Sequence, residues 1–225
     1  MNNLSWKLIA ALVINSLSSG AAQAVLVDFE GLSGMPFTPS GTAIPISSQI
    51  SDQYLATDGV LFSSDNSPFI AAVNLGTEHA TSGTIGVGGS DSLGSLSYSG
   101  TFFKATFFDP SNITDTGVTD FVSVRTDLVR FIDRVESVTF SAFDINGNLL
   151  GLSTQDDTGG LLLSLAFDGI HSVTFSGVSA SALDDFTFNT VTPANVPIPA
   201  AFWLFGTGVL GFISLSHKNK TQVTA

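Results

Sequence analysis

Glu-Ser-Val-Thr-Phe-Ser-Ala-Phe, residues 136–143, alternates polar and apolar side chains, a pattern typical of a half-buried β-strand. Residues two apart share one face of a strand, so three side chains are predicted to face a core: Val138, Phe140 and Ala142. The segment Asp-Ile-Asn-Gly-Asn follows at 144–148, and an apolar run resumes at 149–152. Because an Asn-Gly pair accepts the positive φ angles of a type I′ turn, these two runs are predicted to form a hairpin.

Further strands are expected on both sides of this hairpin. Residues 171–176 repeat the alternation, with Val173 and Phe175 facing the core, and the pentapeptide Ser-Val-Thr-Phe-Ser occurs at both 137–141 and 172–176. In a strand-biased composition this repeat is little evidence for duplication. Other candidate strands are 25–30, 59–63, 101–108, 119–125, 160–167 and 183–189. So many short strands predict an all-β fold, an antiparallel jelly-roll-like β-sandwich.

The length and charge of the chain fit a single acidic domain. Of 225 residues only 12% are charged, and the Gly/Ser-rich stretch 82–100 is interpreted as a long loop, because strands resume beyond it. All 19 acidic residues lie between Asp28 and Asp185, opposed there by Lys104, Arg125, Arg130 and Arg134, which gives 4 − 19 = −15. This negative field disfavours nucleic-acid binding; it favours attraction of divalent cations, repulsion between copies, or simply solubility.

The N-terminal 24 residues have the pattern of a secretory signal peptide. Lys7 precedes the apolar run 8–14, and the small residues of Ala22-Gln23-Ala24 stand where a signal peptidase cleaves. The mature chain is therefore expected to begin near Val25. The alternative, a short buried helix, does not account for the Ala-x-Ala ending. With no cysteine in the chain, a disulfide framework and a thiolate metal site are excluded.

Residues 193–225 have the pattern of a second addressing segment. No charge occurs from Ile198 to Leu215, about 18 residues, which is enough for one transmembrane helix. Lys218 and Lys220 follow this stretch, so the positive-inside rule places the tail in the cytoplasm and the acidic domain outside. The prolines before the span stiffen the chain into an extended, protease-accessible form. The alternative is an ordinary single-pass anchor with Gly206, Gly208 and Gly211 as a packing face.

The C-terminal segment resembles the PEP-CTERM sorting signal of Gram-negative, exopolysaccharide-producing bacteria. The resemblance covers about 195–220 and is carried by a Pro box, a Gly-containing span and a basic tail: Val196, Pro197, Pro199, Ala200, Ala201, Trp203, Gly206, Gly208, Lys218 and Lys220. Ile198 stands where the name-giving Glu lies between the prolines, so the exosortase subtype is open. The resemblance implies processing near the Pro box by an exosortase, a membrane-embedded cysteine transpeptidase-like enzyme.

Motifs of catalysis are mostly absent from the predicted domain, 25–192. No G-x-S-x-G elbow, H-E-x-x-H motif or P-loop occurs, and the domain has only His79 and His171, which are interpreted as structural. The acidic pairs 156–157 and 184–185 match a glycosidase by residue type alone. Adjacent strand residues point to opposite faces, so neither pair is expected to flank one scissile bond. The chain is therefore predicted not to be an enzyme.

The domain also loosely resembles the ectodomains that precede this sorting signal, which are similar to galactose-binding-like and carbohydrate-binding sandwiches. The short motifs are residues 28–30, Tyr54 with 59–63, and 184–188. In similar sandwiches the first and last strands lie side by side and hold one structural calcium ion through acidic side chains. The matching candidates here are Asp28, Glu30 and Asp184. The alternative is that they are solvated strand-end carboxylates; the oxygens of 144–148 are explained by the hairpin.

Sugar binding has little support from the composition, because the rings that stack on sugars are scarce. Trp6 and Trp203 lie in the addressing segments, and the domain retains only Tyr54 and Tyr98, while the 19 Phe are more simply core. The expected function is that of a non-catalytic exported protein, first anchored in the inner membrane and then released to the cell surface or a biofilm exopolysaccharide matrix. Its expected partners are signal peptidase, an exosortase and the membrane, with exopolysaccharide open; the competing functions are carbohydrate-binding module and, behind it, hydrolase.

Overall fold

The computed structural model describes residues 23–77, 79–98, 100–128, 136–157, 160–177 and 181–194. The predicted signal peptide up to Ala22 and the whole sorting motif lie outside these ranges. Strands make up 61% of the structure and helices 5%, and the fold is the predicted β-sandwich. Within the described residues, no helix reaches the length and apolarity that crossing a membrane requires.

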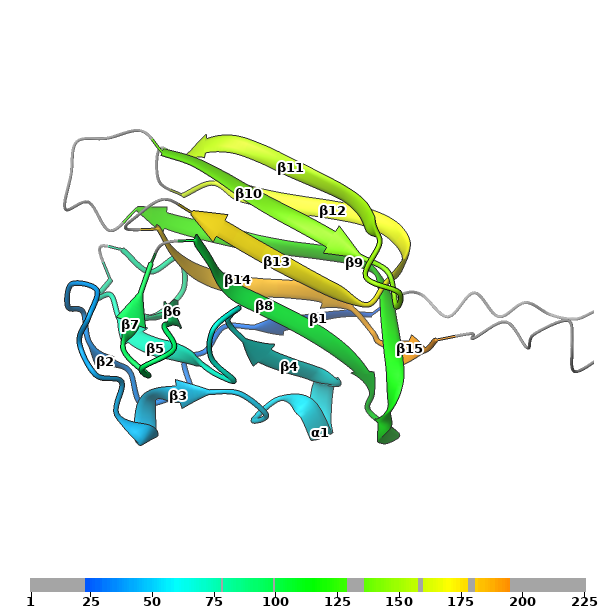
Figure 1. Cartoon of the computed structure of the whole chain (residues 1–225), viewed down its shortest axis with the longest axis horizontal. Helices are drawn as coiled ribbons and strands as arrows, with labels where there is room; N and C mark the ends of the chain where they lie inside the picture. The colour runs from blue at the N-terminus through cyan, green and yellow to red at the C-terminus, as the bar shows by residue number, and fades with distance from the viewer. Residues whose placement is uncertain are drawn as a thin grey trace, which may run out of the picture.

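One layer of the sandwich, sheet I, has the strand order β11-β10-β13-β8-β4 (Figure 1). Its neighbouring strands are all antiparallel. Their bounds are β4 Val60–Ser63, β8 Gly100–Asp109, β10 Glu136–Phe143, β11 Leu149–Asp157 and β13 Ser172–Gly177.

The second layer, sheet II, follows the order β12-β9-β14-β6-β5. Its bounds are β5 Ile70–Asn74, β6 Ile85–Ser90, β9 Asn112–Leu128, β12 Leu162–Ile170 and β14 Ser181–Asn189. Short strands border it: β1 Ala24–Val27 on β14, β2 Met35–Pro36 and β3 Gln49–Ile50 on β5, β7 Leu96–Ser97 on β6 and β15 Thr192–Pro193 on β9. The remaining elements are the 3-10 helix η1 Ile46–Ser48 and the single-turn helix α1 Leu55–Asp58.

The core between the sheets is built largely from phenylalanine. Val138, Phe140 and Ala142 are fully buried, as are Val173 and Phe175, which confirms the faces predicted from the alternation. The largest fully buried rings share one cluster, in which several pairs meet edge to face: Phe29, Phe62, Phe102, Phe103, Phe107, Phe140, Phe175, Phe186 and Phe188. Burying each such ring stabilises the fold by roughly 1.5–3 kcal/mol.

The repeated pentapeptide takes a specific place in this core. β10 and β13 are antiparallel neighbours, and Phe140 of one copy lies opposite Phe175 of the other. Each copy thereby sends Val and Phe inward and its Ser and Thr residues to the outer face of sheet I. The repeated sequence thus gives two adjacent strands the same pattern of inward-facing and outward-facing side chains.

The predicted hairpin exists, but its turn type was wrong. Gly147 donates its N–H to the carbonyl of Asp144 at 3.1 Å and has a φ of 79°, whereas Asn146 is not among the positive-φ residues. This is a type I turn followed by a left-handed glycine rather than a type I′ turn. The cause is Asp144, whose carboxylate accepts the N–H of Asn146 and of Asn148, both at 2.8 Å.

The prediction of a long loop over 82–100 was also wrong, because this stretch contains β6 and β7. All six residues of β6 are buried, although three of them are glycines. A Cβ at Gly86 would strike Leu75, one at Gly88 Tyr98, and one at Gly89 Phe102. The glycines are therefore required by close packing, where the sequence pattern indicated flexibility.

Candidate functional site

Two of the predicted calcium ligands, Glu30 and Asp184, meet at one segment of main chain, residues 81–85. Oε1 of Glu30 accepts the N–H of Thr84 at 2.8 Å and of Ile85 at 2.6 Å. Oδ2 of Asp184 accepts the N–H of Ser82 at 2.9 Å. We call this arrangement the carboxylate clamp. It connects the end of β1, the start of β6 and the middle of β14.

Asp184 is the buried half of the clamp, with no exposed surface. Its Oδ1 also accepts the N–H of Asp185 at 2.7 Å. Burial raises the pKa of this carboxyl to about 6, because the charged form loses its hydration, and the main-chain N–H groups only partly offset that loss. Asp184 therefore titrates closer to neutrality than an ordinary aspartate.

The backbone around the clamp adopts conformations that residues other than glycine seldom adopt. Phe29 has a φ of 59° and Asp185 a φ of 49°, and they are the two non-glycine residues with positive φ in the described part of the chain. Gly83 has a φ of 50°, and a Cβ there would collide with the Glu30 carboxylate. Fully buried Phe29 and the hydrogen bonds of Asp185 hold these conformations in place.

The pair Asp184-Asp185 departs from the alternation that the sequence predicts. The register between β14 and β9 shifts between Asp184 and Thr187, which is a β-bulge. As a result both carboxylates reach Ser82: Asp184 takes its N–H, and Oδ1 of Asp185 accepts its Oγ–H at 2.8 Å. The prediction that this pair points to opposite faces was wrong. In the other pair, Asp156 is exposed on β11 and the side chain of Asp157 lies outside the described set.

The third predicted calcium ligand, Asp28, binds locally: its Oδ1 accepts the N–H of Glu30 at 3.2 Å. β1 and β14 are side by side, as the calcium prediction requires, with Val27 opposite Phe186. Across the described ranges, however, no three Asp, Glu, His or Cys side chains gather where they could hold a metal ion. The known contacts of Glu30 and Asp184 are main-chain N–H groups, which compete with a cation for the same oxygens. Calcium binding stays a prediction.

Of the two tyrosines in the domain, one is buried and the other is half-buried against phenylalanine rings. Tyr98 is 3% exposed within a second core cluster on the outer side of sheet II, and its hydroxyl has no hydrogen-bond partner in the described structure. Tyr54 is half-buried, with Phe29 and Phe62 packed edge to face against it at 6.1 and 5.9 Å between ring centroids. Burial, then Asp28 and Asp58, raise the pKa of its phenol. The burial of Tyr98 excludes it as one of the two rings that remained for sugar stacking.

Among the described residues, His171 is the histidine whose side chain has a recorded hydrogen bond. Nδ1 of His171 lies 3.0 Å from the carbonyl oxygen of Gly117, and its ring meets Phe108 edge to face. It joins the start of β13 to β9. The interpretation of His171 as structural fits this contact.

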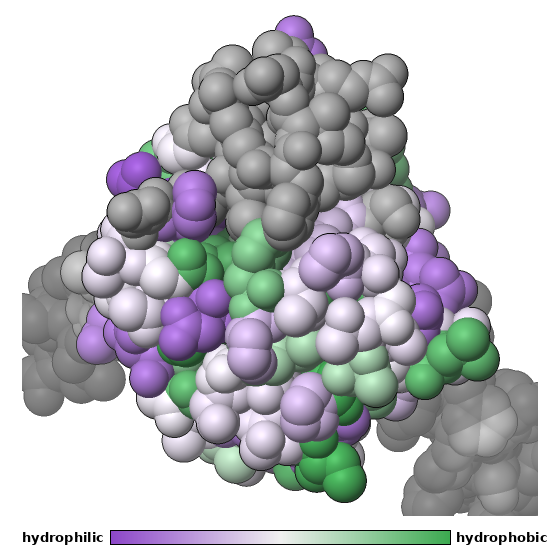
Figure 2. Space-filling view, turned by 90° about the vertical axis from the view of Figure 1, so that its left-hand side faces the viewer, coloured by the Kyte–Doolittle hydropathy of each residue, from purple (hydrophilic) through white to green (hydrophobic). Residues whose placement is uncertain are grey.

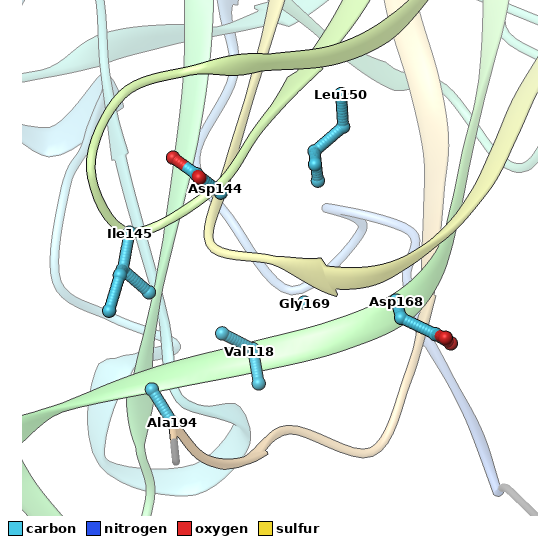
Figure 3. Close-up of a pocket in the computed structure, with 7 residues that line it drawn as sticks. All are labelled: Val118, Asp144, Ile145, Leu150, Asp168, Gly169 and Ala194. Carbon is cyan, nitrogen blue, oxygen red and sulfur yellow. The ribbon is translucent and has the colours of Figure 1, made fainter. Parts of the chain in front are cut away.

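A pocket of about 410 Å³ opens where β15 lies against β9, beside the β10–β11 hairpin. It is lined by Val118, Asp144, Ile145, Leu150, Asp168, Gly169 and Ala194. In Figure 3 the aliphatic side chains surround the opening while the carboxylates of Asp144 and Asp168 point away from its centre. Hydrogen bonds from Asn148 lower the pKa of Asp144, which is held in its turn. The pocket thus presents mainly apolar atoms, and no sequence pattern predicted it.

Figure 2 shows the opposite end of the sandwich. Near-neutral residues cover most of that view, with hydrophobic and hydrophilic residues in several separate places. Of the sequence-predicted cleavage residues, Ala24 is described and begins β1, whereas Ala22 lies outside the described residues.

Comparisons with known proteins leave the family open. No family model matches the chain, and no curated protein matches it. Among solved structures it is similar to the Clostridium thermocellum xylanase 10B CBM22-1–GH10 modules in complex with xylohexaose, with 12% identity, TM-score 0.36, and coverage of 72% of this chain and 30% of that one. It is also similar to the arabinose-bound MgGH51 α-L-arabinofuranosidase, with 11% identity, TM-score 0.34, and coverage of 71% of this chain and 28% of that one.

A third similar structure is the enzymatically active domain of bacteriophage CBA120 tailspike protein 4, with 12% identity, TM-score 0.29, and coverage of 63% of this chain and 20% of that one. The chain therefore spans less than a third of each of these three structures. Similarity at this level carries no argument about activity.

Proposed function

We propose that this chain is a non-catalytic exported β-sandwich that a PEP-CTERM-like signal sorts to the cell surface or extracellular matrix. Export would follow the N-terminal signal peptide, with cleavage after Ala24. The C-terminal helix would hold the protein at the inner membrane until an exosortase processes it near Pro197 and Pro199. The sandwich would then be the cargo.

The observation that supports this proposal is where the chain enters and leaves the sandwich. Val25, the expected first residue of the mature chain, lies opposite Phe188 in β14, and β1 continues beside β14 as far as Val27, opposite Phe186 (Figure 1). Before cleavage the carbonyl of Gln23 also accepts the N–H and the Oγ–H of Thr190, each at 2.9 Å. The start of the mature domain is thus paired directly with the strand that leads to the C-terminal segment, although the two lie at opposite ends of the domain sequence.

The last described residue stays close to this junction. Ala194 follows Thr190 by four residues, which span at most about 14 Å. Its N–H donates to the carbonyl of Thr116 at 2.9 Å, and β15 is paired with β9 at Val118 and Gly117. A membrane segment attached after Ala194 would leave the sandwich at the same end as the signal peptide. The remainder of the acidic domain would then project away from the membrane.

The arrangement of the acidic groups supports a non-catalytic cargo. Glu30, Asp144 and Asp184 each accept hydrogen bonds from main-chain N–H groups, which is a structural role. Asp109 does the same for Ser111, whose hydroxyl and N–H lower the pKa of that carboxyl. These carboxylates stabilise turns and strand connections.

The test is the C-terminal mass of the mature protein, isolated from otherwise identical hosts with and without an exosortase. We expect loss of the segment after the Pro box only where the enzyme is present. Changing Pro197 and Pro199 to Ala should preserve the full-length tail, whereas the matched change Pro193→Ala, in β15, should leave processing intact. An unprocessed Trp203 segment in both hosts would refute the sorting proposal and leave a simple membrane anchor.

A further inference from the structure

β11 is the outermost strand of sheet I and has one free edge. It pairs with β10 along its whole length, from Glu136 opposite Asp157 to Phe143 opposite Leu149. No other described strand forms a ladder with it, and Figure 1 shows it at the border of the sheet. Such an edge presents a row of main-chain N–H and C=O groups that another strand can bind.

This edge lacks the features that protect other borders of the sandwich. β12, at the border of sheet II, is interrupted by a bulge between Ala166 and Ile170 and carries Asp168 there. β2 ends in Pro36 and β15 contains Pro193, and proline cannot donate to a ladder. In β11, the run from Leu149 to Gln155 contains neither proline nor charge.

Two leucines on β11 are more than half exposed: Leu149 at 52% and Leu152 at 53%. Leu152 lies opposite Ser141 and two residues from Thr154, whose Oγ1 is 3.0 Å from that of Thr139. Because residues two apart share a face, Leu152 belongs to the outer face of sheet I, with these hydroxyl groups. This apolar side chain is thus more than half exposed at an open edge.

Charge decides which partner fits the edge. With a net charge of −12, two copies of this chain repel one another over most of their surfaces. Between Asp144 and Asp156 there is no charged residue at all. A second copy can therefore approach along this stretch without bringing carboxylates together, and two identical apolar edges are self-complementary.

We propose that β11 pairs with β11 of a second copy, antiparallel, about a two-fold axis through Leu152. In this register Leu149 lies opposite Gln155, Leu150 opposite Thr154 and Gly151 opposite Ser153. Only uncharged residues face one another from Leu149 to Gln155, and the two Leu152 side chains are in contact on the axis. Asp156 of each copy lies opposite Asn148 of the other. Sheet I of one copy continues into sheet I of the other, which is the isologous contact expected of a symmetric dimer.

The interface is small, since it consists of one strand pair and its flanking leucines. Interfaces below about 1,200 Å² belong to weak or transient complexes, so we expect rapid exchange in solution. Covalent trapping is therefore the suitable assay. It does not depend on the sorting proposal, because the sandwich alone carries the edge.

The absence of native cysteine makes single-cysteine trapping unambiguous. In the full-length chain in detergent, Leu152→Cys should form a disulfide-linked dimer under mild oxidation, because directly opposite residues bring their Cβ atoms within about 4.5–5.5 Å. Leu26→Cys and Leu162→Cys are the matched controls, at 57% and 49% exposure on β1 and β12. We expect at least a tenfold higher yield for Leu152→Cys than for either control.

The register gives a second, independent measurement. Leu149→Cys alone should trap poorly, whereas an equal mixture of Leu149→Cys and Gln155→Cys should give the mixed dimer. Equal yields for Leu152→Cys and the two controls, or no dimer from any variant, would overturn the proposal. So would a mixed dimer no more abundant than the two symmetric ones, because it would show that β11 meets a second copy by random collision.

Discussion

Oδ2 of Asp184, in β14, lies 2.9 Å from the main-chain nitrogen of Ser82, 102 residues earlier in the chain. This contact, together with those of Glu30 to Thr84 and Ile85, holds the entry to β6 against the middle of β14 and the segment that follows β1. Only Leu183 of β14 is paired directly with β6, opposite Val87. The carboxylate clamp therefore supplies much of the connection at this point of sheet II.

The first prediction concerns the pH dependence of stability that Asp184 causes. Its pKa is about 6 in the folded chain and is expected near the ordinary 3.8 when unfolded, so the folded state binds the proton more tightly. Its stabilising contribution is full below pH 3.8 and is lost as the pH rises through 6. We expect Asp184→Asn to remove this dependence. Lowering the pH from 7 to 5 should therefore raise the melting temperature of wild type relative to that of the variant.

The size of this effect should be on the order of 1–3 kcal/mol, since one pKa unit corresponds to about 1.4 kcal/mol. Asp65→Asn changes an exposed aspartate in the turn after β4 and is the matched control. Its melting temperature should follow that of wild type in parallel across the same pH range. If the melting temperatures of Asp184→Asn and wild type instead change in parallel with pH, Asp184 titrates like an ordinary carboxyl.

The second prediction concerns the buried hydroxyl of Tyr98. It has no hydrogen-bond partner in the described structure, and an unsatisfied buried polar group costs about 1–3 kcal/mol. Tyr98→Phe removes the hydroxyl and keeps the ring against Phe37, 5.9 Å away between centroids. We expect its melting temperature to rise by about 2–4 °C. Tyr54→Phe, at a half-buried ring, should change it by less than about 2 °C; a fall for Tyr98→Phe would reveal a partner for the hydroxyl.

The sequence predicted the sandwich because most of its strands face a core on one side only. In β10 and β13 the period-two pattern is unbroken, so Val138, Phe140 and Phe175 identify the inner face without any tertiary information. β6 was missed because it is buried throughout and rich in glycine, a composition that locally indicates a loop. What makes it a strand is the close approach of Leu75, Tyr98 and Phe102, which only the fold brings there.

The candidate site was predicted less well, for a related reason. The sequence identified Glu30 and Asp184 as acidic residues on the first and last strands, and the structure brings both to one segment. It could not identify that segment, because the groups bound are main-chain N–H donors, which every residue except proline possesses. Nor could it place Asp185, whose direction depends on a bulge against β9. The pair Asp184-Asp185 breaking the alternation of β14 was the one available signal.

The third prediction separates a calcium site from a purely hydrogen-bonded clamp. Calcium that binds only the folded state at a hundred times its Kd adds about 2.7 kcal/mol, so its removal would lower the melting temperature by roughly 5–10 °C. Because Glu30 and Asp184 already accept main-chain N–H groups, we expect EDTA to change the midpoint by less than about 1 °C. Glu30→Gln should cost at most about 1 kcal/mol, since its amide oxygen can still accept both bonds, whereas Glu30→Ala should cost about 1–3 kcal/mol. A large fall in EDTA that added calcium restores, together with an equal loss in Glu30→Gln and Glu30→Ala, would instead establish Glu30 as a calcium ligand.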